Sequence, residues 1–258
     1  MLNMHQLRSV GRGLSTLSVL LLLALIGVIV VAVVRHSRAR PVVIHTAGGA
    51  TASREGEGGS SRPTPVSPGF EGCPPDGDGG DRELNRLKNR VDSAGWKATP
   101  FETIRQLPWP ADVTRRTRSE WSRSDSVAVA RREGLPVAVE GYFVGAKQEG
   151  PEATNCHGAD RSFRDWHIWL AAGPGKDRRH SIVAEVTPAV RAAHPEWSLS
   201  MIHKLVRDST PVRVSGWLLF DQDHPEQLGK TRGTLWEIHP VLRIEVRRGK
   251  GWVQLGQS

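Results

Sequence analysis

A period-two alternation of apolar and polar residues runs through five successive segments and constrains the fold more than any other feature of the chain. Side chains point alternately to the two faces of a β-strand, so this alternation is typical of half-buried strands. In the last segment, one face carries Glu237 and His239, and the other carries the apolar residues Trp236, Ile238, Leu242, Ile244 and Val246. The predicted strands are 137–147, 165–171, 181–187, 211–220 and 234–246.

A segment without this alternation separates the third and fourth predicted strands. Residues 190–208 instead place Trp197, Met201 and Leu205 at helical intervals, with His194-Pro195 as the helix start. Three strands, a helix and two strands is the order of elements in the OB-fold, a five-stranded Greek-key barrel. The sequence therefore predicts a mainly β fold with an OB-like barrel over 137–248 and a tail over 249–258, with other small barrels as alternatives.

An almost unbroken apolar run over residues 17–34 follows an N-terminal flank of residues 1–16. As a helix it would span roughly 27 Å, close to the hydrocarbon thickness of a bilayer. Arginines rather than a small-residue cleavage site follow it, which favours an uncleaved single-pass transmembrane anchor over a signal peptide. The lipid bilayer is thus a predicted partner. We expect the soluble domain on the extracytoplasmic side, although the arginine count leans slightly towards the cytoplasm.

Residues 35–80 are rich in Gly, Pro, Ser and Thr and poor in large apolar groups, which predicts a disordered tether. Residues 81–136 predict short helices that pack on the barrel, one capped near Asp81 and an arginine-rich one over 111–133. The net charge of +8 favours an anionic ligand such as nucleic acid or another anionic polymer. Acidic residues interrupt the arginines of 111–133, so a solvated helix face is the alternative reading there.

Strand parity predicts one polar cluster on the barrel. In the OB topology the second strand neighbours the third, and the third neighbours the fifth, so polar side chains of equal parity meet on one face. We expect this face to be the outer surface. It is interpreted as an ordinary polar exterior, a metal or catalytic cluster, or a polar ligand-binding face. Its members are Asp165, His167, Glu185, Glu237 and His239.

A zinc site, or a site for another divalent metal, is one hypothesis for this region. Thiolate, imidazole and carboxylate are all zinc ligands, and Cys156, His157, His167 and His239 are the candidates. The spacing matches no standard zinc finger. A disulfide between Cys73 and Cys156 is the competing hypothesis, which would exclude Cys156 as a ligand.

The loop 221–233 and exposed tryptophans extend the predicted ligand site. In an OB-fold the loop between the fourth and fifth strands flanks the ligand face, as does the loop that carries Cys156. Trp169 and Trp217, if exposed, would stack on bases or sugar rings. The predicted ligand-binding residues are Asp165, Trp169, Glu185, His224, Arg232 and Glu237.

Several motifs resemble those of an uncharacterised bacterial protein family. The resemblance covers about residues 72–246 and is most specific in GWLLFDQDH and WEIHPV, with further matches in DWHIWL and VAEVTP. Similar sequences often have CNCH where this chain has Thr154-Asn155-Cys156-His157, and the missing first cysteine weakens a dithiol metal site. The resemblance implies the OB-like barrel and no particular reaction.

Three functions follow as hypotheses. The leading one is a membrane-anchored OB-like module that binds a polar or anionic ligand. The second is a metal-dependent hydrolase or nuclease that uses a His/Asp/Glu site. The third is an envelope scaffold that binds another protein. The sequence contains no phosphate-binding loop and no GxSxG or HExxH motif, so most familiar enzyme classes receive no support and whether the protein is an enzyme stays open.

Overall fold

A computed structural model describes residues 65–257, and the predicted transmembrane helix over 17–34 lies outside these residues. Among residues 65–257, no helix is both long enough and apolar enough to cross a bilayer. The membrane anchor and its lipid partner therefore remain predictions.

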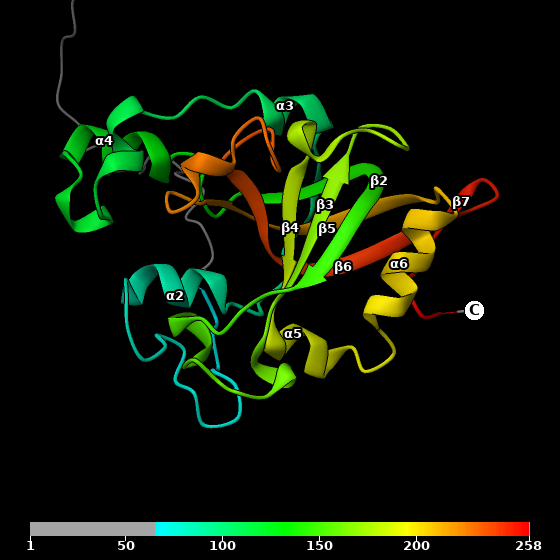
Figure 1. The fold of residues 1–258 in the computed structure, drawn as a ribbon, viewed down its shortest axis with the longest axis horizontal. Helices are drawn as coiled ribbons and strands as arrows, with labels where there is room; N and C mark the ends of the chain where they lie inside the picture. Colours follow the sequence, from blue (N-terminus) through cyan, green and yellow to red (C-terminus); the bar gives the residue numbers. More distant parts are fainter. Residues whose placement is uncertain (1–64, 258) are drawn as a thin grey trace, which may run out of the picture. The chain divides into compact units, whose positions relative to one another are not determined.

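The described chain is mainly β, and its centre is a closed five-stranded barrel (Figure 1). Neighbouring strands pair in the order β2, β3, β4, β6, β5, and β5 pairs back to β2. The β4–β6 pairing is parallel and the other pairings of the barrel are antiparallel. This topology is consistent with the predicted OB-like fold. The barrel strands are Pro136–Gln148 (β2), Trp166–Ala171 (β3), Ile182–Val186 (β4), Pro211–Phe220 (β5) and Trp236–Arg248 (β6).

Two short strands extend the barrel beyond the prediction. Lys97–Ala98 (β1) pairs in parallel with β2, and Gly251–Gln254 (β7) forms a hairpin with β6. The expected C-terminal tail over 249–258 is therefore partly a strand. The turn at Gly249 has a φ of 56°, a conformation that glycine adopts without a Cβ penalty.

The connection between β4 and β5 contains two helices rather than one. Pro188–Ala193 (α5) and Leu199–Arg207 (α6) are separated at His194-Pro195, which was the predicted helix start. The Ser198 side chain accepts a hydrogen bond from the Met201 amide and so caps α6. The indole nitrogen of the buried Trp197 donates to the Leu255 carbonyl at 3.1 Å, which fixes this connection against the C-terminal segment.

The lead-in to the barrel is helical, as expected, but more broken. Asp81 caps Arg82–Lys88 (α2) by accepting from the Glu83 and Leu84 amides. The predicted long helix over 111–133 consists of two 3₁₀ turns followed by Arg123–Ala130 (α4), because Thr117 and Ser122 each cap a new start. A further short helix, Phe101–Arg105 (α3), follows β1.

Within residues 65–257, one hydrophobic core fills the barrel and extends beneath the lead-in. Alternate side chains of β3 (Trp166, Ile168 and Leu170) enter it, as the strand parity predicts. Phe101 and Ile104 from α3 and Ile202 from α6 pack on the same core. The lead-in therefore adds a second layer to the barrel, and this layer decides which barrel face meets solvent.

Candidate functional site

The polar faces of β3, β4 and β6 meet in one cluster, as strand parity predicts. His167 lies opposite Glu185 in the β3–β4 register, and Ala184 lies opposite Ile238 in the β4–β6 register. These registers bring Glu237 and His239 beside Glu185. Sequence reasoning thus identified side chains that do share one face of the sheet.

The expectation that this face is the outer surface is wrong. All five side chains are buried, and the most exposed residue, Glu185, retains 7% of its accessible surface. The loop between β2 and β3 lies over them, and Asn155 from this loop donates to Asp165 Oδ1 at 2.9 Å. α2 packs against β6 from the same side. The β2–β3 loop and α2 therefore form a second layer that buries the outer face of the barrel. Strand alternation does not predict such a layer.

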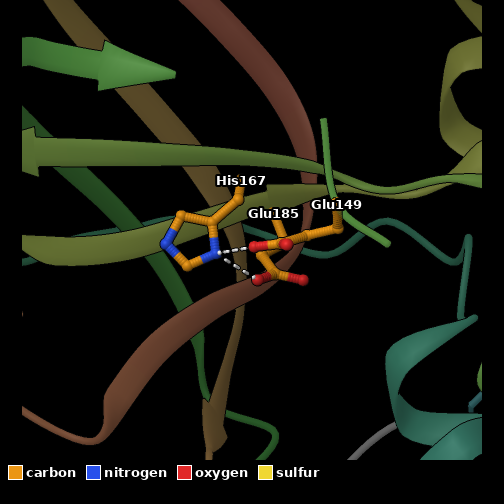
Figure 2. Close-up of side chains that lie close together, drawn as sticks. All are labelled: Glu149, His167 and Glu185. Carbon is orange, nitrogen blue, oxygen red and sulfur yellow. Dashed lines mark ion pairs between the residues drawn. The ribbon is translucent and has the colours of Figure 1, made fainter. Parts of the chain in front are cut away.

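One part of the cluster is a histidine held by two carboxylates (Figure 2). His167 Nδ1 lies 2.8 Å from Glu149 Oε1 and 2.9 Å from Glu185 Oε1. Burial alone would lower the pKa of His167, but the two carboxylates raise it to about 9. Burial would likewise raise the pKa of Glu185, whereas His167 and His239 lower it to about 2. The triad is therefore an ion pair at neutral pH.

The other part of the cluster contains Asp165, His239 and Glu237. Burial raises the pKa of Asp165 to about 7, and the negative charge of Glu152 adds to this rise. His239 Nδ1 bonds Glu237 Oε1 at 3.1 Å, and His239 Nε2 lies 3.7 Å from Asp165 Oδ2. Three buried atoms here have no hydrogen-bond partner among residues 65–257: Asp165 Oδ2, His239 Nε2 and Glu237 Oε2.

A charged network continues the cluster into the β5–β6 loop. The guanidinium of the buried Arg232 bonds Asp221 and lies 3.5 Å from Glu237 Oε2. His224 Nδ1 contacts Asp221 Oδ2 at 2.8 Å. Burial would raise the pKa of Asp221, but His224 and Arg232 hold it well below its usual range. The predicted site residues His224 and Arg232 thus join the cluster through Asp221 and Glu237.

A cleft of about 1160 Å³ opens above the cluster. Its walls come from α2, residues 117–133, the β2–β3 loop and the start of the β5–β6 loop. Lys88, Glu152 and His224 line the cleft. Burial would lower the pKa of Lys88, but Glu152 and the carboxylates of the cluster beneath raise it. Lys88 and Glu152 therefore couple the cleft electrostatically to the buried groups.

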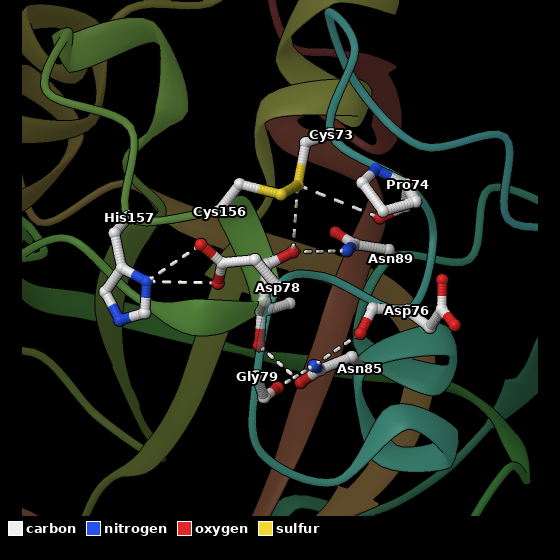
Figure 3. The surroundings of a disulfide bond; sticks show 10 residues. Cys73, Pro74, Asp76, Asp78, Gly79, Asn85, Asn89, Cys156 and His157 are labelled. Atoms are coloured by element: carbon white, nitrogen blue, oxygen red, sulfur yellow. Dashed lines mark hydrogen bonds and ion pairs between the residues drawn. A yellow bond between two sulfur atoms is a disulfide. The ribbon is translucent and has the colours of Figure 1, made fainter.

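Two predicted metal ligands do not join the cluster. Cys156 forms a disulfide with Cys73, which removes its thiolate from metal binding (Figure 3). The neighbouring His157 side chain is 59% exposed and lies 3.0 Å from Asp78 at the rim of the cleft. Of the predicted ligand set, His167 and His239 remain as buried groups that can hold a cation.

The predicted stacking platforms are not open to a ligand. Trp169 is buried beneath the Arg178 guanidinium, which lies 4.0 Å from its ring centroid. Trp217 is buried under Arg90 and Trp96. Both tryptophans project from the barrel as the alternation indicates, and arginines from neighbouring segments cover them.

Four residues of the site escaped sequence reasoning: Glu149, Glu152, Asp221 and Lys88. Pairing the predicted strands 137–147 and 165–171 as a hairpin would have placed Glu149 beside the second strand. In the structure, the Glu149 amide donates to the Asp165 carbonyl at 2.8 Å. Lys88 has no such signal, because α2 reaches the cluster only through tertiary packing.

Comparisons with protein families, curated proteins and solved structures find no match to this chain. The resemblance to an uncharacterised bacterial family therefore stays a prediction. The site itself consists of an open cleft above buried carboxylates and imidazoles, and some of these buried groups have polar atoms without a hydrogen-bond partner within residues 65–257.

Proposed function

We propose that the protein is a membrane-anchored OB-like binding module that receives a polar ligand in the cleft above the buried cluster. The position of the cleft carries this proposal. It lies between the β2–β3 loop and the β5–β6 loop, which correspond to the two loops that flank the ligand face of OB-folds. α2 and residues 117–133 narrow this face from an open groove to a cleft, which favours a compact ligand.

The charges of the cleft favour a neutral or cationic ligand over a polyanion. Among residues 65–257, its lining contains more acids than permanent cations: Asp81, Glu83, Glu133, Glu152 and Asp223 against Arg82, Lys88 and Arg118. A nucleic-acid strand needs a basic track and exposed aromatic platforms. Ser119, Ser126 and the half-buried Trp121 add hydroxyl and aromatic groups to the cleft lining. This chemistry suits a short saccharide segment of an envelope polymer.

Two features support an extracytoplasmic location. The apolar run over 17–34 predicts an N-terminal anchor, and the Cys73–Cys156 disulfide is typical of oxidising compartments. The scaffold alternative receives less support, because Val66 and Val127 are the large hydrophobic side chains exposed among residues 65–257. Such scattered residues do not form the apolar patch that typical protein interfaces use.

A bulky side chain on the cleft wall should block saccharide binding. Ala130 lies on the cleft wall and is exposed, so Ala130→Trp would place an indole in the cleft without disturbing a buried site. The probes are the neutral disaccharides diacetylchitobiose and trehalose, observed by saturation-transfer NMR with the full chain. We expect at least one disaccharide to bind the wild type and neither to bind Ala130→Trp.

Val127→Trp is the matched control, because Val127 lies on the same helix but outside the cleft lining. It should bind like the wild type. A salt-dependent complex with a single-stranded oligothymidine that survives Ala130→Trp, with no disaccharide bound by any variant, would contradict the proposal and favour a nucleic-acid surface elsewhere.

A further inference from the structure

We infer that Asp165, Glu185 and His239 form a binding site for one divalent metal cation in the buried cluster beneath the cleft. This inference goes beyond the proposed ligand, since the cation and the ligand would occupy different positions. One potential ligand atom from each residue lies within 4.8 Å of the other two. All three residues are buried, so a cation there would be held by the protein rather than by bulk water.

The unpartnered atoms indicate where the cation would lie. Asp165 Oδ2 and His239 Nε2 are 3.7 Å apart, and neither has a hydrogen-bond partner among residues 65–257. This separation is too long for a hydrogen bond. Two ligands at about 2.1 Å from one metal ion lie roughly 3.0–3.6 Å apart. A cation between these atoms would satisfy both with a small adjustment.

The remaining atoms of both side chains have the partners that metal ligands usually have. Asp165 Oδ1 accepts from Asn155 at 2.9 Å, which turns Oδ2 towards His239. His239 Nδ1 lies 3.1 Å from Glu237 Oε1 and 3.3 Å from Glu185 Oε2, which favours a proton on Nδ1 and a lone pair on Nε2. Metal-bound histidines commonly donate their other nitrogen to a carboxylate in this way. To join Asp165 and His239 as the third ligand, the Glu185 carboxylate would turn from Nδ1 towards the Nε2 side.

The surrounding charge also favours a cation. Carboxylates outnumber the permanent cations around this position within residues 65–257: Glu149, Glu152, Asp165, Glu185 and Glu237 against Lys88, Arg191 and Arg232. His167 compensates part of this charge through Glu149 and Glu185. A divalent ion would balance the remaining negative charge. Glu152 lines the cleft and interacts electrostatically with Glu185 and His239, so it links the metal position to the cleft.

The donor set points to a transition metal. Two carboxylates and one imidazole suit Zn²⁺ or Mn²⁺, whereas an all-oxygen set would suit Ca²⁺ or Mg²⁺. The neighbouring triad of Glu149, His167 and Glu185 is a weaker candidate. Its carboxylate oxygens are not among the unpartnered buried atoms, and His167 Nδ1 already contacts both carboxylates.

The test is metal binding to the full chain, purified without an affinity tag and stripped with EDTA. Equilibrium dialysis against ZnCl₂ and MnCl₂, followed by elemental analysis, should show one bound equivalent of at least one of these metals. Asp165→Asn preserves the shape of the side chain and should weaken binding at least about tenfold. His239→Gln should do the same. His157→Asn changes an exposed histidine outside the cluster and should bind like the wild type.

Failure of the folded wild type to retain either metal would overturn the inference, whatever the variants do. Equal affinity of the wild type, Asp165→Asn and His239→Gln would overturn it as well, with folding checked by circular dichroism. The Ala130→Trp variant separates this result from the proposed function. This variant should bind the metal with the affinity of the wild type but no longer bind the disaccharide. Failure of the metal site and failure of the proposed ligand site can therefore be told apart.

Discussion

At the residue scale, Arg90 shows how a tryptophan predicted as a stacking platform becomes structural. Its guanidinium lies 3.5 Å from the Trp217 ring centroid and bonds Asp92 at 2.6 and 2.9 Å. The Trp217 indole nitrogen donates to the Asp92 carbonyl at 2.9 Å. Arg90 is 3% exposed, so its charge depends on Asp92 and on the ring face for stabilisation.

We predict that Arg90→Met lowers the free energy of unfolding by roughly 2–4 kcal/mol, because the substitution leaves Asp92 without its ion pair and removes the cation from Trp217. Urea unfolding measures the loss, and Trp217 fluorescence should change as well. Arg86→Met is the control, since Arg86 is exposed and lies 3.6 Å from its partner Asp76. Its effect should stay below about 1 kcal/mol. Equal losses in the two variants would contradict this role of Arg90.

At the scale of elements, β5 and β6 are joined by a buried carboxylate as well as by their backbone ladder. Glu245 accepts from Arg213 at 2.6 and 2.8 Å and from Arg243 at 2.7 Å. The Arg213 guanidinium, opposed by burial and assisted by Arg243, holds the pKa of Glu245 below its ordinary value of 4.5. A carboxyl with a lowered folded-state pKa stabilises the fold above its unfolded pKa and loses this contribution as the pH falls.

Glu245→Gln should therefore lower the urea midpoint at about pH 7, and its difference from the wild type should shrink as the pH falls below about 4.5. Arg213→Gln removes the partner charge and should show the same trend. Urea midpoints of the wild type and both variants, measured at about pH 7 and about pH 3.5, give the comparison. A difference that stays constant over this range would show that Glu245 contributes through packing rather than through charge.

Strand alternation predicted much at this scale, but not everything. It located the barrel strands and grouped Glu185 with His239, because the parity of a strand is a local property. It failed around Leu242, where one extra residue between Val241 and Arg243 forms a bulge against β5. Val241 is therefore fully buried in the core, whereas the expected Leu242 is partly buried at its edge. A bulge depends on the pairing of two strands, so one strand alone does not reveal it.

At the scale of the described residues, the lead-in converts the outer face of β3, β4 and β6 into a cleft with a buried floor. No periodicity within 137–248 predicts this cover, since it comes from α2 and from contacts between distant segments. The Cys73–Cys156 disulfide joins the segment before α2 to the β2–β3 loop (Figure 3). Asn89 from the end of α2 donates to the Thr154 carbonyl at 2.9 Å and strengthens this junction. The expected tether over 35–80 thus reaches a fixed attachment at Cys73.

The disulfide should therefore govern both stability and the closure of the site. It links residues 83 positions apart, and the chain-entropy estimate for such a loop is about 4.5 kcal/mol. A Cys73→Ser/Cys156→Ser variant should lose stability of this order in urea unfolding. Hydrogen exchange should rise in α2 and the β2–β3 loop more than in β5, because the barrel ladder does not depend on this link. Reduction of the wild type should reproduce both effects and leave the double variant unchanged. Uniform exchange across all strands would instead mean that the lead-in and the barrel unfold as one unit, with no separable cover over the cluster.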